Sequence, residues 1–449
     1  MYTNKIYVNL PVILQNIYVS VFSLVKKLLR DSKRARYLEE ELKSHERNNA
    51  ILENYSEGRL KSTLLNAVNN TSFYKAYGAE LSQFPTIDKS VVKNGYDSLR
   101  NTRYRGFEIN GETSGTTGTP LTIKQTKESV EFERAFANRQ RRWAGFEKGD
   151  RRAWLRGDMI VPIKQSKAPF WRYSYFEDMI LLSSYHMTRQ ALPMYIDAMV
   201  EYGVDVIQAY PSSVLTLARY LKENKTYYPG KVKSVLTSSE SLSKEDKALI
   251  EERFKCTVFD WYGLFERVAA IASCEEGNYH ILTDYSYVEL LPAGKLEDGR
   301  KRAEIVGTNF NNSLYPLIRY KTGDHVILSE QNSCPCGRVY PVIDEIEGRV
   351  GDYLVAENGQ KIHILNHIPK GVTGLLATQF VQNELNKVTI LAIVNIEDFT
   401  EKQKARLINN AIEKLGNGMS ISVKIVDSIP RTRNGKVRQA ICNVKVRND

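Results

Sequence analysis

The sequence predicts an α/β protein whose large N-terminal domain is built on parallel strands. Between about residues 113 and 350, strand-like runs alternate with helical runs. VKSVLTSS at 232–239 and TVFDWYG at 257–263 have the pattern of strands, whereas 212–224 and 244–255 have apolar residues at helical spacing. Strands separated by helices of this length form parallel βαβ units, so we expect this part of the chain to contain parallel βαβ sheets.

The C-terminal part of the chain has a different character. Short strands at 387–395 and 420–427 lie on either side of one helix at 400–415, which indicates a small α+β unit. The expected division is a large domain at 1–348 that begins with a helical extension at 1–60, a connecting segment at 349–352 and this small domain at 353–449.

The composition is that of an ordinary globular protein and limits its partners. Of the 449 residues, 42% are hydrophobic and 26% are charged, which excludes collagen-like and disordered chains. The 63 Lys and Arg residues against 52 Asp and Glu residues give a net charge of +11. Such an excess favours phosphate-rich ligands or anionic lipid, or is simply a solvated basic surface. The sequence has neither a long basic block nor a recognition motif, so nucleic acid is not an expected partner.

Cysteine usage bears on the cellular compartment. The five cysteines are too few and too unevenly spaced for the disulfide framework of an extracellular protein. We therefore expect a cytoplasmic, reducing location, with a peripheral position at the inner membrane face as an alternative.

The N-terminal segment contains an apolar stripe that ends in basic residues. Leu14, Ile17, Val21, Val25 and Leu28 follow helical spacing after a proline. Polar residues interrupt the run, so it has too few consecutive apolar residues to cross a bilayer. An apolar stripe beside basic residues can lie on an anionic membrane surface. The alternatives are that it packs on its own protein or on the partner in a homodimer. The interrupting residues are Gln15, Asn16, Ser20 and Ser23, and the basic residues are Lys26, Lys27, Arg30, Lys33, Arg34 and Arg36.

The most informative string is TSGTTGTPL at 113–121. Its glycines and hydroxyl residues make a flexible turn whose N–H and O–H groups can surround a polyphosphate. No G-K-[ST] sequence ends it, so it is not a Walker loop. A surface linker is the alternative for such a string on its own.

Together with four further motifs, this string resembles the adenylate-forming superfamily of acyl-CoA synthetases, peptide-synthetase adenylation domains and luciferases. The phenylacetate–CoA ligase-like branch fits best, in particular its members associated with capsule and surface-polysaccharide synthesis. The motifs occur in the family's order over almost the entire chain. The other four are WYGLFE at 261–266, PLIRYKTGD at 316–324, IEGRVGD at 346–352 and IPRTRNGKVR at 429–438.

The resemblance implies an ATP-dependent ligase. A carboxylate attacks the α-phosphate of ATP, pyrophosphate leaves, and transfer of the acyl group to an acceptor releases AMP. Such a reaction depends chiefly on positioning and on electrostatic stabilisation of phosphoryl oxygens. The resemblance places Thr117 closest to the α-phosphate. The other residues that it implies for phosphate binding are Thr113, Ser114, Gly115, Thr116 and Gly118.

The same resemblance assigns residues to the nucleoside. Tyr262, next to Gly263, would stack on adenine, and Ser239 and Glu240 would flank the base. Asp324 would accept hydrogen bonds from both ribose hydroxyls. Outside the motifs, Tyr262 would be interpreted as a core aromatic and Asp324 as a turn cap.

Three more residues are assigned to catalysis and to the hinge. Glu266 would bind Mg²⁺, a hard cation that favours carboxylate oxygen. The resemblance implies a hinge at 349–352 and a mobile lid at 353–449, and Arg349 would approach the ribose or phosphate from the hinge. Lys436, on the C-terminal lysine loop, would reach the α-phosphate and the substrate carboxylate when the lid rotates.

Departures from the family pattern leave the acceptor open. Thr119 stands where many relatives have lysine, and Gly351 stands where the hinge aspartate is usual. The lid matches the family loosely in the region that faces the CoA channel in thioester-forming relatives. The expected partner is a small carboxylic acid, and the acceptor is CoA or an amine. The second case would be an amide-forming ligase that modifies a capsular or surface polysaccharide or its precursor. A non-catalytic nucleotide-binding homologue is the third alternative.

A separate group of residues suggests a structural metal. Five residues lie between Cys274 and His280, and Cys334 and Cys336 form a C-x-C turn followed by glycine. Three thiolates and one imidazole suit tetrahedral Zn²⁺. Ordinary buried thiols are the alternative. Phenylacetate–CoA ligase relatives with cysteines at matching places hold a structural zinc, so the resemblance favours the metal.

Overall fold

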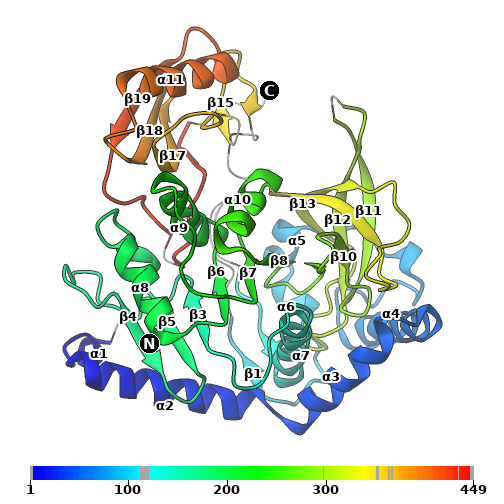
Figure 1. Cartoon of the computed structure of the whole chain (residues 1–449). Helices are drawn as coiled ribbons and strands as arrows, with labels where there is room; N and C mark the ends of the chain where they lie inside the picture. The colour runs from blue at the N-terminus through cyan, green and yellow to red at the C-terminus, as the bar shows by residue number, and fades with distance from the viewer. Residues whose placement is uncertain are drawn as a thin grey trace.

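The computed structural model describes residues 4–111, 121–296, 298–349, 353–362, 365, 368–432 and 434–444. The N-terminal helices run along one side of a large domain, and a small C-terminal domain sits at the opposite end (Figure 1). The large domain is organised around one extended mixed sheet.

The N-terminal extension is helical, as predicted. It consists of α1 (Lys5–Val8), α2 (Val12–Arg30), α3 (Lys33–His45) and α4 (Asn49–Asn70). α2 begins directly after Pro11. α3 and α4 begin where Ser32 and Asn48 accept hydrogen bonds from the backbone N–H groups of Ala35 and Ile51, which caps each helix.

The predicted parallel βαβ units form one half of the sheet. β3, β5, β6, β7 and β8 pair in parallel, and β4 closes the edge in antiparallel orientation. The helices α8, α9 and α10 lie between successive strands in the sequence. The bounds are β3 (Arg152–Leu155), β4 (Trp171–Ser174), β5 (Met179–Leu182), α8 (Leu192–Tyr202), β6 (Val206–Ala209), α9 (Pro211–Glu223), β7 (Ser234–Ser238), α10 (Lys244–Phe254) and β8 (Thr257–Gly263).

The parallel pattern ends earlier than predicted. Between residues 270 and 349 the described strands pair in antiparallel orientation, because short turns rather than helices connect several of them. These strands are β9 (Ala270–Ser273), β10 (Tyr279–Ile281), β11 (Ser286–Lys295), β12 (Lys301–Asn309), β13 (Tyr320–Leu328) and β14 (Val342–Arg349). Within the described residues the sheet has twelve strands, in the order β11-β12-β13-β14-β10-β9-β8-β7-β6-β3-β5-β4.

The two faces of this sheet pack against different helices. On β7, Val235 lies in the core that contains residues of α8, α9 and α10, whereas Leu236 lies in the core that contains residues of α3 and α7 (Lys127–Trp143). Adjacent strand residues point to opposite faces, so one strand contributes to both cores. The segment between α4 and α7 contains η1 (Leu81–Gln83), α5 (Lys89–Asn94), α6 (Tyr96–Leu99), β1 (Glu108–Ile109) and β2 (Gln125–Thr126).

The C-terminal domain has its own sheet and core. In the described residues its sheet order is β19-β18-β17-β20, and α11 packs on it through Leu407, Ala411 and Leu415. In Figure 1 this domain lies beside α9 and α10. The backbone carbonyl of Leu376 accepts a hydrogen bond of 2.9 Å from Arg219 of α9. The elements are β15 (Leu354–Val355), β16 (Lys361–Ile362), β17 (Leu375–Glu384), β18 (Lys387–Val394), α11 (Glu401–Leu415), β19 (Ser420–Ile425) and β20 (Ala440–Cys442).

Candidate active site

A cleft of about 1750 Å³ lies between the large domain and the C-terminal domain. Predicted site residues from segments far apart in the sequence line it together. Thr113, Ser114, Gly115, Thr116, Thr117, Gly118 and Thr119 lie outside the described residues, as does Gly351 of the hinge. Arg349 ends β14, and its side chain is not described. The cleft-lining residues that the sequence predicted are Ser239, Glu240, Tyr262, Gly263, Glu266, Asp324 and Lys436.

Tyr262 and Asp324 meet across two strands of the sheet. Tyr262 lies near the end of β8, and its hydroxyl donates a hydrogen bond of 2.6 Å to Oδ2 of Asp324 on β13. Asp324 is 3% exposed. A carboxylate has about four lone-pair positions and can accept more than one hydrogen bond.

Glu266 lies in the turn after β8 and is buried. Its Oε1 accepts a hydrogen bond of 3.2 Å from the hydroxyl of Tyr320. Among the described residues it forms no ion pair. A buried carboxylate that lines a cleft fits the oxygen donor that Mg²⁺ requires.

Glu240 connects the two domains, a role that its motif does not predict. Its Oε2 accepts a hydrogen bond of 2.9 Å from the backbone N–H of Ser212, at the start of α9. Its Oε1 accepts one of 2.8 Å from the backbone N–H of Val437, in the lysine loop. The preceding residue, Ser239, has a left-handed φ of 73° and accepts a hydrogen bond of 2.9 Å from Arg156. The lysine loop therefore packs against the turn after β7.

The lysine loop is docked against the large domain. The carbonyl of Asn434 accepts a hydrogen bond of 3.0 Å from the hydroxyl of Tyr210. Gly435 has a φ of 74°, and a Cβ atom at this position would come within 2.1 Å of the Cα of Gly157. A side chain here would prevent the close approach. Lys436 is thereby held in the cleft that also contains Glu266.

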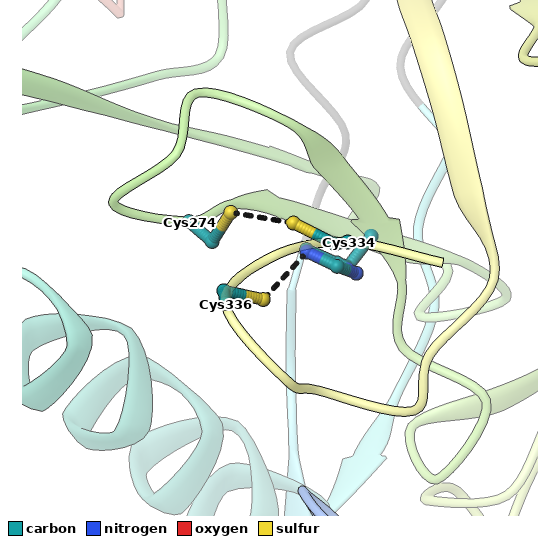
Figure 2. A group of neighbouring side chains, drawn as sticks. Cys274, Cys334 and Cys336 are labelled. Carbon is teal, nitrogen blue, oxygen red and sulfur yellow. Dashed lines mark hydrogen bonds between the residues drawn. The ribbon is translucent and has the colours of Figure 1, made fainter. Parts of the chain in front are cut away.

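The predicted metal ligands also converge. The candidate donor atoms of Cys274, His280, Cys334 and Cys336 all lie within 4.8 Å of one another. Figure 2 shows the three thiols gathered at one point. The Sγ atoms of Cys274 and Cys334 are 3.6 Å apart, and Sγ of Cys336 is 3.5 Å from Nε2 of His280. Tetrahedral zinc, with bonds of ~2.3 Å to sulfur and ~2.0 Å to nitrogen, separates neighbouring donors by ~3.5–3.8 Å. The donor set and its spacing fit Zn²⁺.

The groups around this cluster suit metal binding. Nδ1 of His280 is 3.3 Å from the carbonyl of Tyr340, a contact that directs Nε2 toward the thiols. Burial lowers the pKa of His280, which favours the neutral imidazole that metal binding needs. Asn278 donates a hydrogen bond of 3.2 Å to Sγ of Cys334. Burial raises the pKa of the Cys274 thiol to about 12, so a cation is needed to stabilise its thiolate.

Sequence relatives are found over the whole chain. Residues 354–443 match the family model of the CapK C-terminal domain. The chain is 27% identical to protein CapK of Staphylococcus aureus, over 98% of this chain and 100% of that protein. It is 23% identical to phenylacetate-coenzyme A ligase of Pseudomonas putida, over 66% of this chain and 70% of that protein.

The fold is similar to that of solved ligases. A crystal structure of 2-hydroxyisobutyryl-CoA ligase in the postadenylation state, in complex with R3-HIB-AMP, aligns with 86% of this chain and 88% of its own. The TM-score is 0.62 and the sequence identity is 16%. At this identity the likeness concerns the fold, and it confirms the predicted α/β class with a separate C-terminal domain.

Proposed function

We propose, on the premise that this chain has the fold of the adenylate-forming ligases, that it activates a carboxylic acid with ATP. A carboxylate oxygen forms a bond to the α-phosphorus, and the bond from that phosphorus to the pyrophosphate oxygen breaks. The products are an acyl-adenylate and pyrophosphate. The observation that carries this proposal is the docked lysine loop, which brings Lys436 into the same cleft as Glu266, Tyr262 and Asp324.

The residues of the cleft have separate tasks in this reaction. Asp324 binds the ribose and Tyr262 packs against the base, which fixes the direction of the nucleotide. Lys436 stabilises charge on the phosphoryl oxygens as the carboxylate attacks. Glu266 would hold Mg²⁺, which neutralises phosphate charge when bound. Thr117 and its neighbours in the phosphate loop are assigned to the polyphosphate from the motif alone.

ATP–pyrophosphate exchange tests this proposal. A panel of aliphatic, hydroxy, aromatic and dicarboxylic acids is added to the protein with ATP, Mg²⁺ and labelled pyrophosphate. We expect labelled ATP to form only when a suitable acid is present, because exchange requires reversal of acyl-adenylate formation. ATP binding without exchange on any acid would contradict the proposal and support a non-catalytic nucleotide-binding homologue.

For the acceptor we propose the thiol of CoA, since the structural relative is a CoA ligase. The second candidate is an amine of a capsular or surface polysaccharide precursor. The alignment with CapK covers 98% of this chain, whereas the alignment with phenylacetate-coenzyme A ligase covers 66% of it. This difference in coverage favours the amine. Mass spectrometry of reactions supplied with CoA or with amino sugars distinguishes a thioester from an amide.

We also propose that Cys274, His280, Cys334 and Cys336 bind one structural Zn²⁺, because their spacing fits tetrahedral coordination.

A further inference from the structure

One face of helix α7 lines the cleft with polar side chains. The helix packs its apolar residues Phe132, Phe136 and Trp143 into the core of the large domain. Another set of its residues, spaced three or four apart, lines the cleft instead. The residues of this cleft face are Val130, Glu133, Arg134, Ala137, Gln140 and Arg141.

The positive charge on this face is not balanced. Nη1 of Arg141 donates a hydrogen bond of 2.9 Å to Oδ1 of Asn138, but Nε has no hydrogen-bond partner. Among the described residues, Arg141 forms no ion pair. Burial lowers its pKa well below the usual value, and the nearby cations Arg152 and Arg134 act in the same direction, while Glu177 and Asp31 oppose this shift only in part. A guanidinium that is withdrawn from water and forms no direct ion pair is costly, so an anion at this place would be stabilising.

The acidic residues near Arg141 are already engaged elsewhere. Arg134 pairs with Asp31 at 3.0 Å, and Arg152 pairs with Glu177 at 3.3 Å. Each of these carboxylates therefore has another arginine as its partner.

Glu133 and Gln140, also on the α7 cleft face, leave the charge of Arg141 available to an anion in the cleft. Glu133 accepts a hydrogen bond of 2.6 Å from the hydroxyl of Tyr285 and lies 3.8 Å from Arg267. Its carboxylate is thus occupied. Gln140 is 6% exposed, and its Nε2 has no hydrogen-bond partner. A nearly buried amide donor and a guanidinium are therefore left for a group that enters the cleft.

We propose that the acid activated by this protein carries a second anionic group, which binds Arg141 and Gln140. This inference rests on the proposed function, since it concerns the acid of that same reaction. The reacting carboxylate lies toward Lys436, and the second group lies toward α7. A dicarboxylic acid is the simplest substrate of this class, because a guanidinium binds a carboxylate with two parallel hydrogen bonds.

Pairs of acids with equal carbon number test the inference. Exchange kinetics are measured for each monocarboxylic acid and for the dicarboxylic acid of the same length. We expect kcat/KM to favour the dicarboxylic acid, and Arg141→Gln to lower this preference by about 10–100-fold, the effect of one lost charge-assisted contact. Arg141→Lys, which keeps the charge, should retain part of the preference.

Arg142→Gln is the matched control. Arg142 is adjacent on α7 but pairs with Glu46 and does not line the cleft, so its loss should leave the preference unaltered. The inference would be overturned if the wild type preferred monocarboxylic acids, or if Arg141→Gln left the ratio of kcat/KM for the dicarboxylic acid to that for the monocarboxylic acid unchanged. Either result would leave the proposed function intact. Absence of exchange with every acid would overturn both.

A second, independent observation concerns the surface of helix α2. Its polar residues face the protein and bond to edge strand β4. Oδ1 of Asn16 accepts a hydrogen bond of 3.0 Å from the backbone N–H of Tyr173. Oγ of Ser20 accepts one of 3.0 Å from the N–H of Tyr175. The residues that interrupt the apolar run thus cover an open sheet edge.

The apolar residues of α2 consequently point outward. Ile13 and Leu28 are 73% and 72% exposed, and Ile17, Val21 and Val25 are each about half exposed. These five side chains are therefore not buried in the described part of the protein. No single helix in the described ranges is long and apolar enough to cross a bilayer; α2 and α3 reach that length and composition only when joined across a 68° bend.

We propose that the exposed face of α2 lies on an anionic membrane surface. Its length is about 28 Å at 1.5 Å per residue, and polar anchors hold it parallel to the protein surface. The basic residues near its ends, Lys5, Lys26, Lys27, Lys33 and Arg34, complement anionic head groups. A second copy of the chain would instead bring together like charges. The proposed position is the inner membrane face.

Co-sedimentation with vesicles tests this surface. We expect binding to phosphatidylglycerol vesicles, weaker binding to phosphatidylcholine vesicles, and loss of binding as salt shortens the screening length from ~8 Å to ~3 Å. Ile17→Ser with Val21→Ser should abolish binding, whereas Ile396→Ser, at an exposed isoleucine of the lid, should not. Absence of vesicle binding, with or without a dimer in sedimentation equilibrium, would overturn the proposal.

Discussion

Replacing Lys436 with alanine should lower ATP–pyrophosphate exchange by about 10²–10³-fold. The lysine loop lies in the cleft, held by Glu240 and by the contact between Gly435 and Gly157. An ammonium that acts only as charge builds on the phosphoryl oxygens stabilises the transition state more than the substrate. Its removal should therefore lower kcat and kcat/KM together. Initial rates of exchange over a range of acid concentrations measure both.

The loss should be confined to the first half-reaction. The resemblance to adenylate-forming enzymes implies that the lid rotates before the acceptor attacks, so transfer from a synthetic acyl-adenylate should be spared. Thermal unfolding should shift little, because Lys436 lines the cleft and does not belong to the buried core. Lys424→Ala, on lid strand β19 and outside the cleft lining, is the matched control. Equal damage to both half-reactions would contradict a rotating lid, and damage to neither would make Lys436 a surface charge.

The sequence predicts the parallel half of the sheet and most of the described site. Strand β8 spans the predicted residues 257–263, and α11 starts one residue after the predicted Thr400, which precedes its first turn. The family resemblance also singles out residues such as Glu266 and Asp324, which line one cleft in the structure; their roles stay predictions. These predictions succeed because strand and helix periodicity is local, and because each motif is a continuous string.

Features that depend on tertiary contacts are not predictable in this way. Helical spacing in α2 identifies an apolar stripe but not which side faces the protein; the bonds of Asn16 and Ser20 to strand β4 decide that. Polar residues of α7 such as Arg141 have the spacing of a solvent-facing surface, and only the position of the cleft shows otherwise. The domain-bridging bonds of Glu240 likewise join segments that are distant in the sequence.

The Cys/His cluster lies on elements that pack beside the strand carrying Asp324. Cys274 and His280 flank the turn between β9 and β10, and the Cys334–Cys336 turn precedes β14. His280 pairs with Val342 of β14, and β14 pairs with β13, which carries Asp324. Arg338, just after the turn, also pairs with Glu275 at 2.7 Å. Loss of the metal should therefore loosen β14 and weaken nucleotide binding as well as stability.

The purified protein should contain about one Zn²⁺ per chain, and Cys336→Ser should remove most of it. Because metal binding contributes directly to folding free energy, we expect Tm to fall on the order of 10 °C. Inductively coupled plasma mass spectrometry and thermal denaturation measure the two effects. A strong chelator should lower the Tm of the wild type to that of Cys336→Ser and leave the variant unchanged. Cys442→Ser, at a cysteine outside the cluster, should keep both metal and Tm. A metal-free wild type with the same Tm and exchange rate as the variant would contradict a structural zinc.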